Sequence, residues 1–353
     1  MEQPSGTERP PTVSVVTVAY GAEPWLERSV VACLESLDEQ VEVVLVDNGC
    51  TDGAVDRLEA VDGVRVLRPD DNTGFAGGCA EGAAVARGSV LAFINPDAVV
   101  EPECLHALAE EVRTGTGIAT ASVRLSEAPD RLNSAGNVVH FLGLSWSGAF
   151  DEPASDHTVR REVVAASGAG MAMDRGLYER LGGFEPEFFA YQEDADLSVR
   201  CWQAGRPVVY VPGAVVVHRY EFSRNTGKFY LLDRNRLIFV LSTYSGPMLA
   251  LLAPLLVVQE LAIWALAAKE GWLPEKRRSV AWVARHLGWV RRRRQSVSAL
   301  RTAPDSSWIG LLSVDLTPGN MPTPDVVARL GRVLGAYWKA VCRLLGGRAG
   351  RGA

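Results

Sequence analysis

The chain has 353 residues, of which 47% are apolar and 22% are charged. These values are ordinary for globular proteins, and they exclude a disordered chain, a collagen-like chain and a small disulfide scaffold. The six cysteines stand singly, so neither a zinc site nor a disulfide framework is predicted, and a reducing compartment is favoured. Residues 1–11 are polar and proline-rich, which predicts a disordered segment without a secretory signal.

The net charge of −6 hides a sharp division along the chain. Residues 1–268 hold 20 basic and 37 acidic side chains, whereas residues 269–353 hold 16 basic and 5 acidic ones. At the junction, residues 248–268 (MLALLAPLLVVQELAIWALAA) are apolar apart from Gln259 and Glu260. This stretch is long enough to span a membrane, but it also suits a helix lying in the lipid interface or a core helix.

Basic and aromatic residues follow the apolar stretch, including the run Arg291 to Arg294. Such residues favour the headgroup layer of an anionic membrane, and no nucleic-acid-binding module accompanies them. We therefore predict a helical, basic, membrane-associated region over 245–347 and a frayed tail over 348–353. The expected location is cytoplasmic, at the inner face of the cell membrane.

Strand and helix signals alternate over the first 125 residues. Apolar, β-branched runs predict strands over 13–19, 41–46, 64–67, 89–94 and 118–123. Helical spacing of apolar residues predicts helices from about Pro24 and over 103–113. Repeated βα units of this length predict an α/β fold, with a mostly parallel sheet and helices on both faces.

Residues 126–165 carry little periodicity, so a loop-rich excursion is expected there. Regular signals then resume, with strands predicted over 168–173 and 207–217 and helices over 193–204 and 226–244.

Polar residues stand where three of the predicted strands end: Ala19-Tyr20-Gly21, Asp47-Asn48 and Asn95-Pro96-Asp97. The carboxyl ends of parallel strands meet at one edge of an open sheet, which is where ligands bind. Asp47 is either a turn former or a carboxylate that accepts the N3–H of a uracil or thymine ring. Asp97 is of the type that binds Mg²⁺ or Mn²⁺ together with substrate phosphates.

A glycine-rich stretch covers Asn72 to Gly82 (NTGFAGGCAEG). It is either a flexible loop before a helix or a place where backbone closely approaches a ligand. Its spacing is not G-x-G-x-x-G, so no dinucleotide fingerprint is predicted.

Three carboxylates, Glu193, Asp194 and Asp196, open a predicted helix after a cluster of aromatic residues. They either favour the helix electrostatically or supply a general base whose pKa is tuned by an apolar wall. His218 ends a predicted strand, as a structural residue or as a metal ligand.

Six motifs in this order, VSVVTVAYG, VVLVDNGCTDG, NTGFAGGCAEG, AFINPDA, FAYQEDADLSVR and KFYLLDRNR, resemble the family 2 glycosyltransferases. That family consists of inverting enzymes of the GT-A fold, and the resemblance covers about residues 12–244. It looks closest to the branch with bacterial rhamnosyl- and galactofuranosyltransferases of cell-surface glycans.

The resemblance implies roles for the matching residues. Tyr20, Asp47 and Asn48 hold the nucleoside, and Asn72 and Gly74 lie along the nucleotide-sugar, with Gly77 and Gly78 shaping the loop. Asn95 and Asp97 stand for the DxD motif, with Asp97 and His218 meeting the metal, Mg²⁺ or Mn²⁺. Asp194 is the catalytic base, Glu193 belongs to the substrate-binding residues, and Arg234 and Asn235 match an element without an assigned role. Two departures from the family pattern are Asn95 at the first acid of DxD and Cys79-Ala80 in the glycine stretch.

The predicted function is that of an inverting, metal-dependent glycosyltransferase. Its donor is expected to be a dTDP- or UDP-sugar, with dTDP-rhamnose among the candidates. Its acceptor is a hydroxyl of a glycan or polyprenyl-linked molecule in cell-wall or surface polysaccharide synthesis. The alternatives are a non-catalytic scaffold that binds nucleotide-sugars at the membrane, which Asn95 keeps open, and a sugar nucleotidyltransferase. The latter needs a glycine-rich basic phosphate loop, and Ala19 to Glu23 lacks one.

Overall fold

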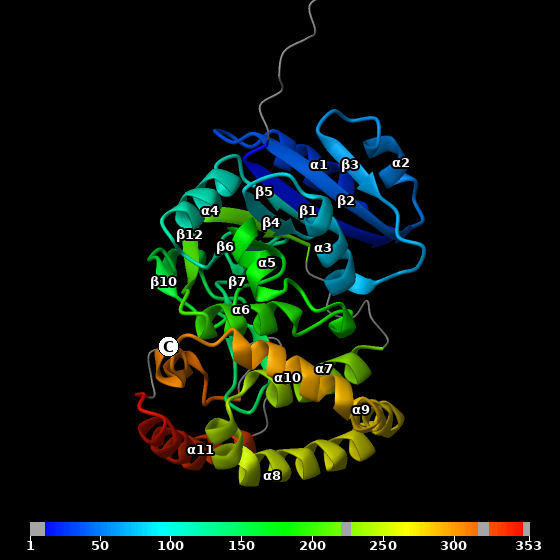
Figure 1. Cartoon of the computed structure of the whole chain (residues 1–353). Helices are drawn as coiled ribbons and strands as arrows, with labels where there is room; N and C mark the ends of the chain where they lie inside the picture. The colour runs from blue at the N-terminus through cyan, green and yellow to red at the C-terminus, as the bar shows by residue number, and fades with distance from the viewer. Residues whose placement is uncertain (1–10, 220–226, 317–324, 349–353) are drawn as a thin grey trace, which may run out of the picture.

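The computed structural model describes residues 11–219, 227–316 and 325–348. The predictions for segment 1–11 and for the tail 348–353 fall almost wholly outside these ranges. Within them, a large sheet with flanking helices occupies the upper part of Figure 1, and a group of helices lies below it.

Ten strands form the large sheet. They are β1 (Val13–Gly21), β2 (Val41–Cys50), β3 (Val64–Leu67), β4 (Val90–Ile94), β5 (Ala98–Val100), β6 (Ile118–Leu125), β7 (Leu132–Ser134), β10 (Arg161–Glu162), β11 (Gly170–Asp174) and β12 (Val208–His218). The main path runs β10-β12-β6-β11-β4-β1-β2-β3, with β5 paired to β12 and β7 to β6. Only β10 and β11 run against the other strands of this path, which confirms a mostly parallel α/β sheet.

The sheet is buried on both faces because its central strands are mostly apolar on both sides. Successive side chains of a strand point to opposite faces. Val16, Val44 and Phe93 accordingly belong to one hydrophobic cluster, while their neighbours Val15 and Leu45 belong to another. The continuous apolar runs in the sequence therefore predicted these strands correctly.

Helices cover both of these faces. They are α1 (Leu26–Leu34), α2 (Ala54–Leu58), α3 (Gly74–Val85), α4 (Cys104–Arg113), α5 (Arg175–Leu181) and α6 (Glu193–Gln203). Buried residues of α1 and α4 join the cluster on one face, and those of α3 and α6 join the cluster on the other.

The predicted loop-rich excursion over 126–165 contains four short strands. β7 and β10 join the large sheet, while β8 (Asn137–Val139) and β9 (Ser145–Ser147) pair only with each other. Each has two or three residues, too few to leave a periodic signal in the sequence.

The C-terminal region is helical, as predicted. It comprises α7 (Lys228–Thr243), α8 (Gly246–Glu270), α9 (Leu273–Arg285), α10 (Leu287–Ala299) and α11 (Asp325–Leu344). α7 contacts α6, α9 and α10, so it connects this region to the sheet domain. α8 and α11 contact each other and form the layer farthest from the sheet (Figure 1). In the described part of the chain, α8 is the one helix whose length and composition would allow it to cross a membrane.

Candidate active site

The polar ends of β1 and β2 lie side by side, because Ala19 pairs with Asp47 and Gly21 with Cys50. Both strands run further than predicted, and a bulge between Ala19 and Gly21 adjusts their register. The Tyr20 side chain is exposed. One Asp47 oxygen accepts the N–H groups of Gly49 and Cys50 at 3.1 and 2.8 Å, so Asp47 does form a turn. Its other oxygen lies 3.7 Å from the Arg68 guanidinium.

The next residue, Asn48, is buried and holds the start of α3. Its Nδ2 donates to the Gly74 carbonyl at 2.8 Å, and its Oδ1 accepts the Thr73 N–H at 3.3 Å. Asn72, which is exposed, accepts the Gly74 N–H at 2.8 Å. These two predicted site residues therefore lie together, and both shape the turn that leads into α3.

Most of the glycine-rich stretch is helix rather than loop, since α3 already begins at Gly74. A Cβ on Gly78 or Gly82 would lie 2.8 or 2.5 Å from a valine side chain of β1. These glycines thus let the helix approach the sheet closely. The expectation that Gly77 and Gly78 shape a loop is wrong, because both lie within α3. Gly74 has φ +72°, and a Cβ there would lie 2.3 Å from the Phe189 carbonyl.

The end of β4 meets the end of β12. His218 Nε2 lies 3.1 Å from an Asp97 carboxylate oxygen and 3.5 Å from the Asn95 amide nitrogen. His218 Nδ1 lies 3.0 Å from Asn133 Oδ1, which can accept only if Nδ1 carries the proton. Nε2 faces the Asp97 carboxylate. The two residues predicted as metal ligands are thus brought into contact.

This donor set fits a divalent cation. A metal-binding imidazole commonly donates its second N–H to an oxygen, as His218 does to Asn133. Nearby, Asn95 Oδ1 is buried and has no hydrogen-bond partner among the described residues. A carboxylate and an imidazole leave most of the coordination positions to phosphate oxygens and water, as Mg²⁺ and Mn²⁺ sites in nucleotide enzymes do.

Glu193 and Asp194 open α6, as predicted, but their surroundings differ. Glu193 is buried, and its Oε2 has no partner in the described parts of the chain. Asp194 is partly accessible, and it accepts Asn137 Nδ2 at 2.8 Å, the Gly168 N–H at 3.1 Å and the Ala195 N–H at 2.7 Å. Burial raises the pKa of both carboxyl groups, that of Glu193 well above its usual range. The donors around Asp194 oppose this effect and favour its charged form.

The loop before β11 connects Asp194 to the end of β4. Gly168 donates its N–H to Asp194, and the carbonyl of the next residue, Ala169, accepts the Asn95 N–H at 3.3 Å. The Asp194 carboxylate on α6 and the Asn95–Asp97 turn therefore adjoin the same loop, residues 167–169. Asn133 and Asn137, which orient His218 and Asp194, were missed because they lie in the aperiodic segment 126–165. Their only signal was the polar run NSAGN.

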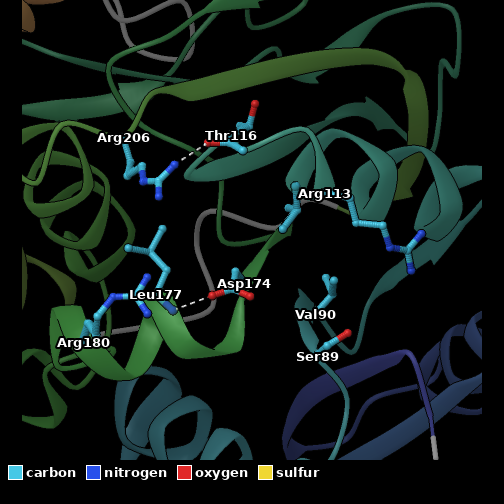
Figure 2. A pocket seen from close by; sticks show the side chains of 10 residues that line it. Ser89, Val90, Arg113, Thr116, Asp174, Leu177, Arg180 and Arg206 are labelled. Atoms are coloured by element: carbon cyan, nitrogen blue, oxygen red, sulfur yellow. Dashed lines mark hydrogen bonds between the residues drawn. The ribbon is translucent and has the colours of Figure 1, made fainter.

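Two other polar features lie away from this edge. A pocket of about 230 Å³ is lined by Ser89, Asp174 and Arg206 among others, at the opposite end of the sheet (Figure 2). Glu39, His106 and Glu110 place their polar atoms within 4.8 Å of one another. Arg113, however, already pairs with both glutamates there, at 2.7 and 2.8 Å.

Comparisons with known proteins agree with this architecture. Residues 14–182 match the family model for glycosyl transferase family 2. The N-acetylglucosaminyl-diphospho-decaprenol L-rhamnosyltransferase of Mycobacterium tuberculosis is 28% identical over 241 residues, which are 59% of this chain and 76% of that protein. Polypeptide N-acetylgalactosaminyltransferase 6 of Homo sapiens is 26% identical over 238 residues, 60% of this chain and 38% of that one.

A solved structure, that of GalNAc-T7 with UDP, GalNAc and Mn²⁺, has a similar fold. It aligns with a TM-score of 0.56 at 19% identity, over 69% of this chain and 51% of that chain. Its likeness supports the GT-A fold inferred from the sheet. Residues 14–182 of the chain therefore form a glycosyl transferase family 2 domain.

Proposed function

We propose that the chain is an inverting glycosyltransferase that moves a sugar from a dTDP- or UDP-sugar to a hydroxyl of a glycan or lipid-linked acceptor. One observation carries the proposal: the 167–169 loop adjoins both a partly accessible carboxylate, Asp194, and the Asn95–Asp97 turn. A base for the acceptor and a site for the donor diphosphate thus share one edge of the sheet.

Asp194 is the base in this mechanism. The acceptor hydroxyl attacks the anomeric carbon as its proton passes to Asp194, and the bond from that carbon to the diphosphate oxygen breaks. Burial makes Asp194 more basic than an exposed aspartate, and its three N–H donors hold it in place. A single in-line displacement of this kind inverts the anomeric centre and needs no covalent nucleophile.

Asp97 and His218 are the residues that would hold a divalent metal ion, Mg²⁺ or Mn²⁺. When bound, such an ion supplies positive charge to the leaving diphosphate. Support comes from their contact at 3.1 Å and from the proton acceptor that Asn133 provides behind the imidazole. The structure of GalNAc-T7, which holds Mn²⁺ together with UDP, points the same way.

The nucleoside is assigned to the ends of β1 and β2. Tyr20 offers an exposed aromatic ring for stacking, and Asp47 offers the carboxylate oxygen that does not serve the turn. A carboxylate accepts the N3–H of uracil or thymine, while cytosine has no such proton. Asn48 and Asn72 contribute by fixing the start of α3 beside this place.

The mycobacterial relative is named for rhamnosyl transfer to a diphospho-decaprenol-linked sugar. By analogy, we infer dTDP-rhamnose as a leading donor and a polyprenyl-linked sugar as acceptor, in cell-wall or surface polysaccharide synthesis. An acceptor of this type lies in a membrane, so the enzyme must work at its cytoplasmic face, where nucleotide-sugars are made.

The helix α8 supports this location. Its inward side carries Glu260, whose Oε2 accepts the fully buried Lys276 Nζ at 2.6 Å and whose other oxygen pairs with Arg236. Its outward side is apolar, with Val257, Val258 and Leu261 at 59%, 61% and 66% exposure. Crossing a bilayer would separate Glu260 from these partners, which costs about 3–5 kcal/mol for a buried ion pair. We infer that α8 lies flat in the lipid interface.

Charge on the neighbouring helix complements an anionic surface. Lys339 and Arg343 are exposed on α11, which packs on α8. The run Arg291 to Arg294 contributes less than expected, because Arg293 is buried against Asp196 at 2.7 Å and Arg294 donates to the Leu241 carbonyl.

A donor panel tests the proposed chemistry. The full-length protein is incubated with dTDP-, UDP- and GDP-sugars and Mn²⁺, and thermal stabilisation and sugar release are measured. We expect a dTDP- or UDP-sugar to stabilise the protein and to be turned over, and chelation to abolish turnover. Binding without turnover on any acceptor or water would favour a scaffold, and a response to GDP-sugars alone would contradict the role of Asp47.

A further inference from the structure

The segment that leads into α6 follows a strained backbone path. Phe189, Tyr191 and Gln192 have φ of 63°, 71° and 74°, a region that residues with a Cβ seldom adopt. They are three of the six non-glycine residues with positive φ in the part of the chain that the structure describes. Such strain persists only where the surroundings hold it, and it clusters at functional sites. Here it directly precedes Glu193 and Asp194.

Two adjacent side chains of α7 hold this segment. Asn235 is fully buried, and its Nδ2 lies 2.8 Å from each of three carbonyls, those of Phe188, Ala190 and Tyr191. Arg234 donates to the carbonyls of Glu187 and Phe188 at 2.5 and 3.0 Å. Its Nε also donates to Asn235 Oδ1 at 3.0 Å, so the guanidinium fixes the orientation of the amide.

The strained segment is fixed on its other side by α3. The Phe189 carbonyl accepts the Ala76 N–H at 3.0 Å, next to the position where Gly74 leaves room for it. The Arg234 guanidinium in turn lies over the rings of Tyr230 and Trp282, at 5.2 and 5.0 Å from their centres. A continuous set of contacts therefore runs from the start of α3, through the strained segment before α6 and Arg234, to Trp282 on α9.

We propose that Arg234 and Asn235 are positioning residues for sugar transfer. They hold the strained segment so that α6 begins with Asp194 beside the 167–169 loop. This inference rests on the proposed function, because it assigns the pair to the step in which Asp194 takes a proton. Without the amide hydrogens, the carbonyls of Ala190 and Tyr191 lose the Asn235 donor, and the Phe188 carbonyl is left with Arg234 and the Ala190 N–H. The segment then relaxes, which moves Asp194 while the nucleoside site at β1 and β2 stays intact.

The test compares two buried amides. Asn235→Asp keeps the shape but removes the donor hydrogens. The matched control is Gln203→Glu at the far end of α6, where the buried Gln203 donates to the Thr243 carbonyl at 2.6 Å. For Asn235→Asp we expect kcat to fall by 100-fold or more while the Kd for dTDP- or UDP-sugar, with Mn²⁺, changes less than threefold. For Gln203→Glu we expect a lower Tm and a kcat within threefold of wild type.

A second variant covers the case in which Asn235→Asp does not fold. Arg234→Lys keeps the charge but loses the planar fork that reaches two carbonyls and Asn235 at once, so we expect a tenfold loss of kcat at unchanged donor affinity. The proposal is overturned if a folded Asn235→Asp enzyme keeps kcat within threefold of wild type. If Asn235→Asp does not fold, the same result for Arg234→Lys overturns it. Equal losses in the Asn235 and Gln203 variants would also overturn it. Wild-type inactivity on every donor would instead contradict the proposed function.

Discussion

At the scale of single residues, burial separates two adjacent carboxylates that the sequence presents as equivalent. Asp194 is partly accessible and has three N–H donors, whereas Glu193 is buried with one oxygen unpartnered among the described residues. A partly accessible carboxylate with three donors suits a base, whereas burial raises the pKa of Glu193 well above its usual range and disfavours its charged form. The role of Glu193 as a substrate contact remains a prediction.

The raised pKa of Glu193 predicts how stability depends on pH. Because its folded pKa lies above the unfolded value of about 4.3, folding favours the protonated form, and stability is lost as pH rises from that value toward the folded pKa. Glu193→Gln cannot lose that proton. We expect its Tm to exceed that of wild type at pH 7–8, with the gain disappearing near pH 4. Melting curves of both proteins from pH 4 to pH 8 test this prediction. A gain in Tm that persists unchanged at pH 4 would contradict it.

Residue patterns alone identified the polar residues at the strand ends but not the asparagines that hydrogen-bond to His218 and Asp194. Asp47, Asp97 and His218 were found because each ends an apolar run. Asn133 and Asn137 were not, because they lie on the short strands β7 and β8, whose three residues each leave no periodic signal. Likewise, the roles of Arg234 and Asn235 depend on carbonyls more than forty residues away.

At the scale of elements, β1, β2 and β4 were predictable because they are buried on both faces and hence mostly apolar. The reversed direction of β11 was not predictable, since a strand's composition does not encode the direction of its neighbours. The helical nature of the glycine-rich stretch was also hidden, because glycine disfavours helices in isolation. Close packing of α3 on β1 explains why glycine is nevertheless required there.

The start of α3 gives a prediction at this scale. Gly74→Ala places a methyl group 2.3 Å from the Phe189 carbonyl and forces a non-glycine residue to φ +72°. We expect a loss of about 2 kcal/mol or more in unfolding free energy, together with lower transfer activity. The control is Gly213→Ala, where a Cβ would meet no atom within 4 Å. Chemical denaturation of both variants tests this, and equal stability of the two would contradict the packing account.

At the scale of the whole molecule, the question is which way α8 faces. The sequence of residues 248–268 left three possibilities open, because both sides of the helix are apolar and Glu260 could be tolerated in each. In the structure, Glu260 points inward to Lys276 and Arg236. An apolar stripe of Val257, Val258 and Leu261 faces outward. That arrangement disfavours a core helix and supports a lipid-facing one.

The proposed place of α8 in the lipid interface predicts how the protein would attach to membranes. Burying a valine or leucine side chain contributes about 1.5–3 kcal/mol, more than the ~1 kcal/mol of a basic residue near an anionic surface. We therefore expect the full-length protein to sediment with anionic liposomes at both low and high salt and to be released by detergent.

The double substitution Val258→Lys with Leu261→Lys should weaken this sedimentation strongly. Val159→Lys, at a site on the sheet domain that is 71% exposed, serves as the control and should leave it unchanged. Release by high salt alone would indicate that only the basic residues touch lipid. Failure to sediment at either salt concentration would contradict membrane attachment.

The central claim is that Asp194 takes the proton of the acceptor hydroxyl, and Asp194→Asn tests it most directly. The measurement pairs kcat for sugar transfer with the Kd for the nucleotide-sugar donor in the presence of Mn²⁺. Asp174→Asn, which changes the exposed N-cap of α5 to another good capping residue at the opposite edge of the sheet, is the matched control. We predict that Asp194→Asn lowers kcat by roughly 10²–10⁴-fold with donor affinity retained, while the control matches wild type. Near-normal transfer by a folded Asp194→Asn enzyme would contradict the account.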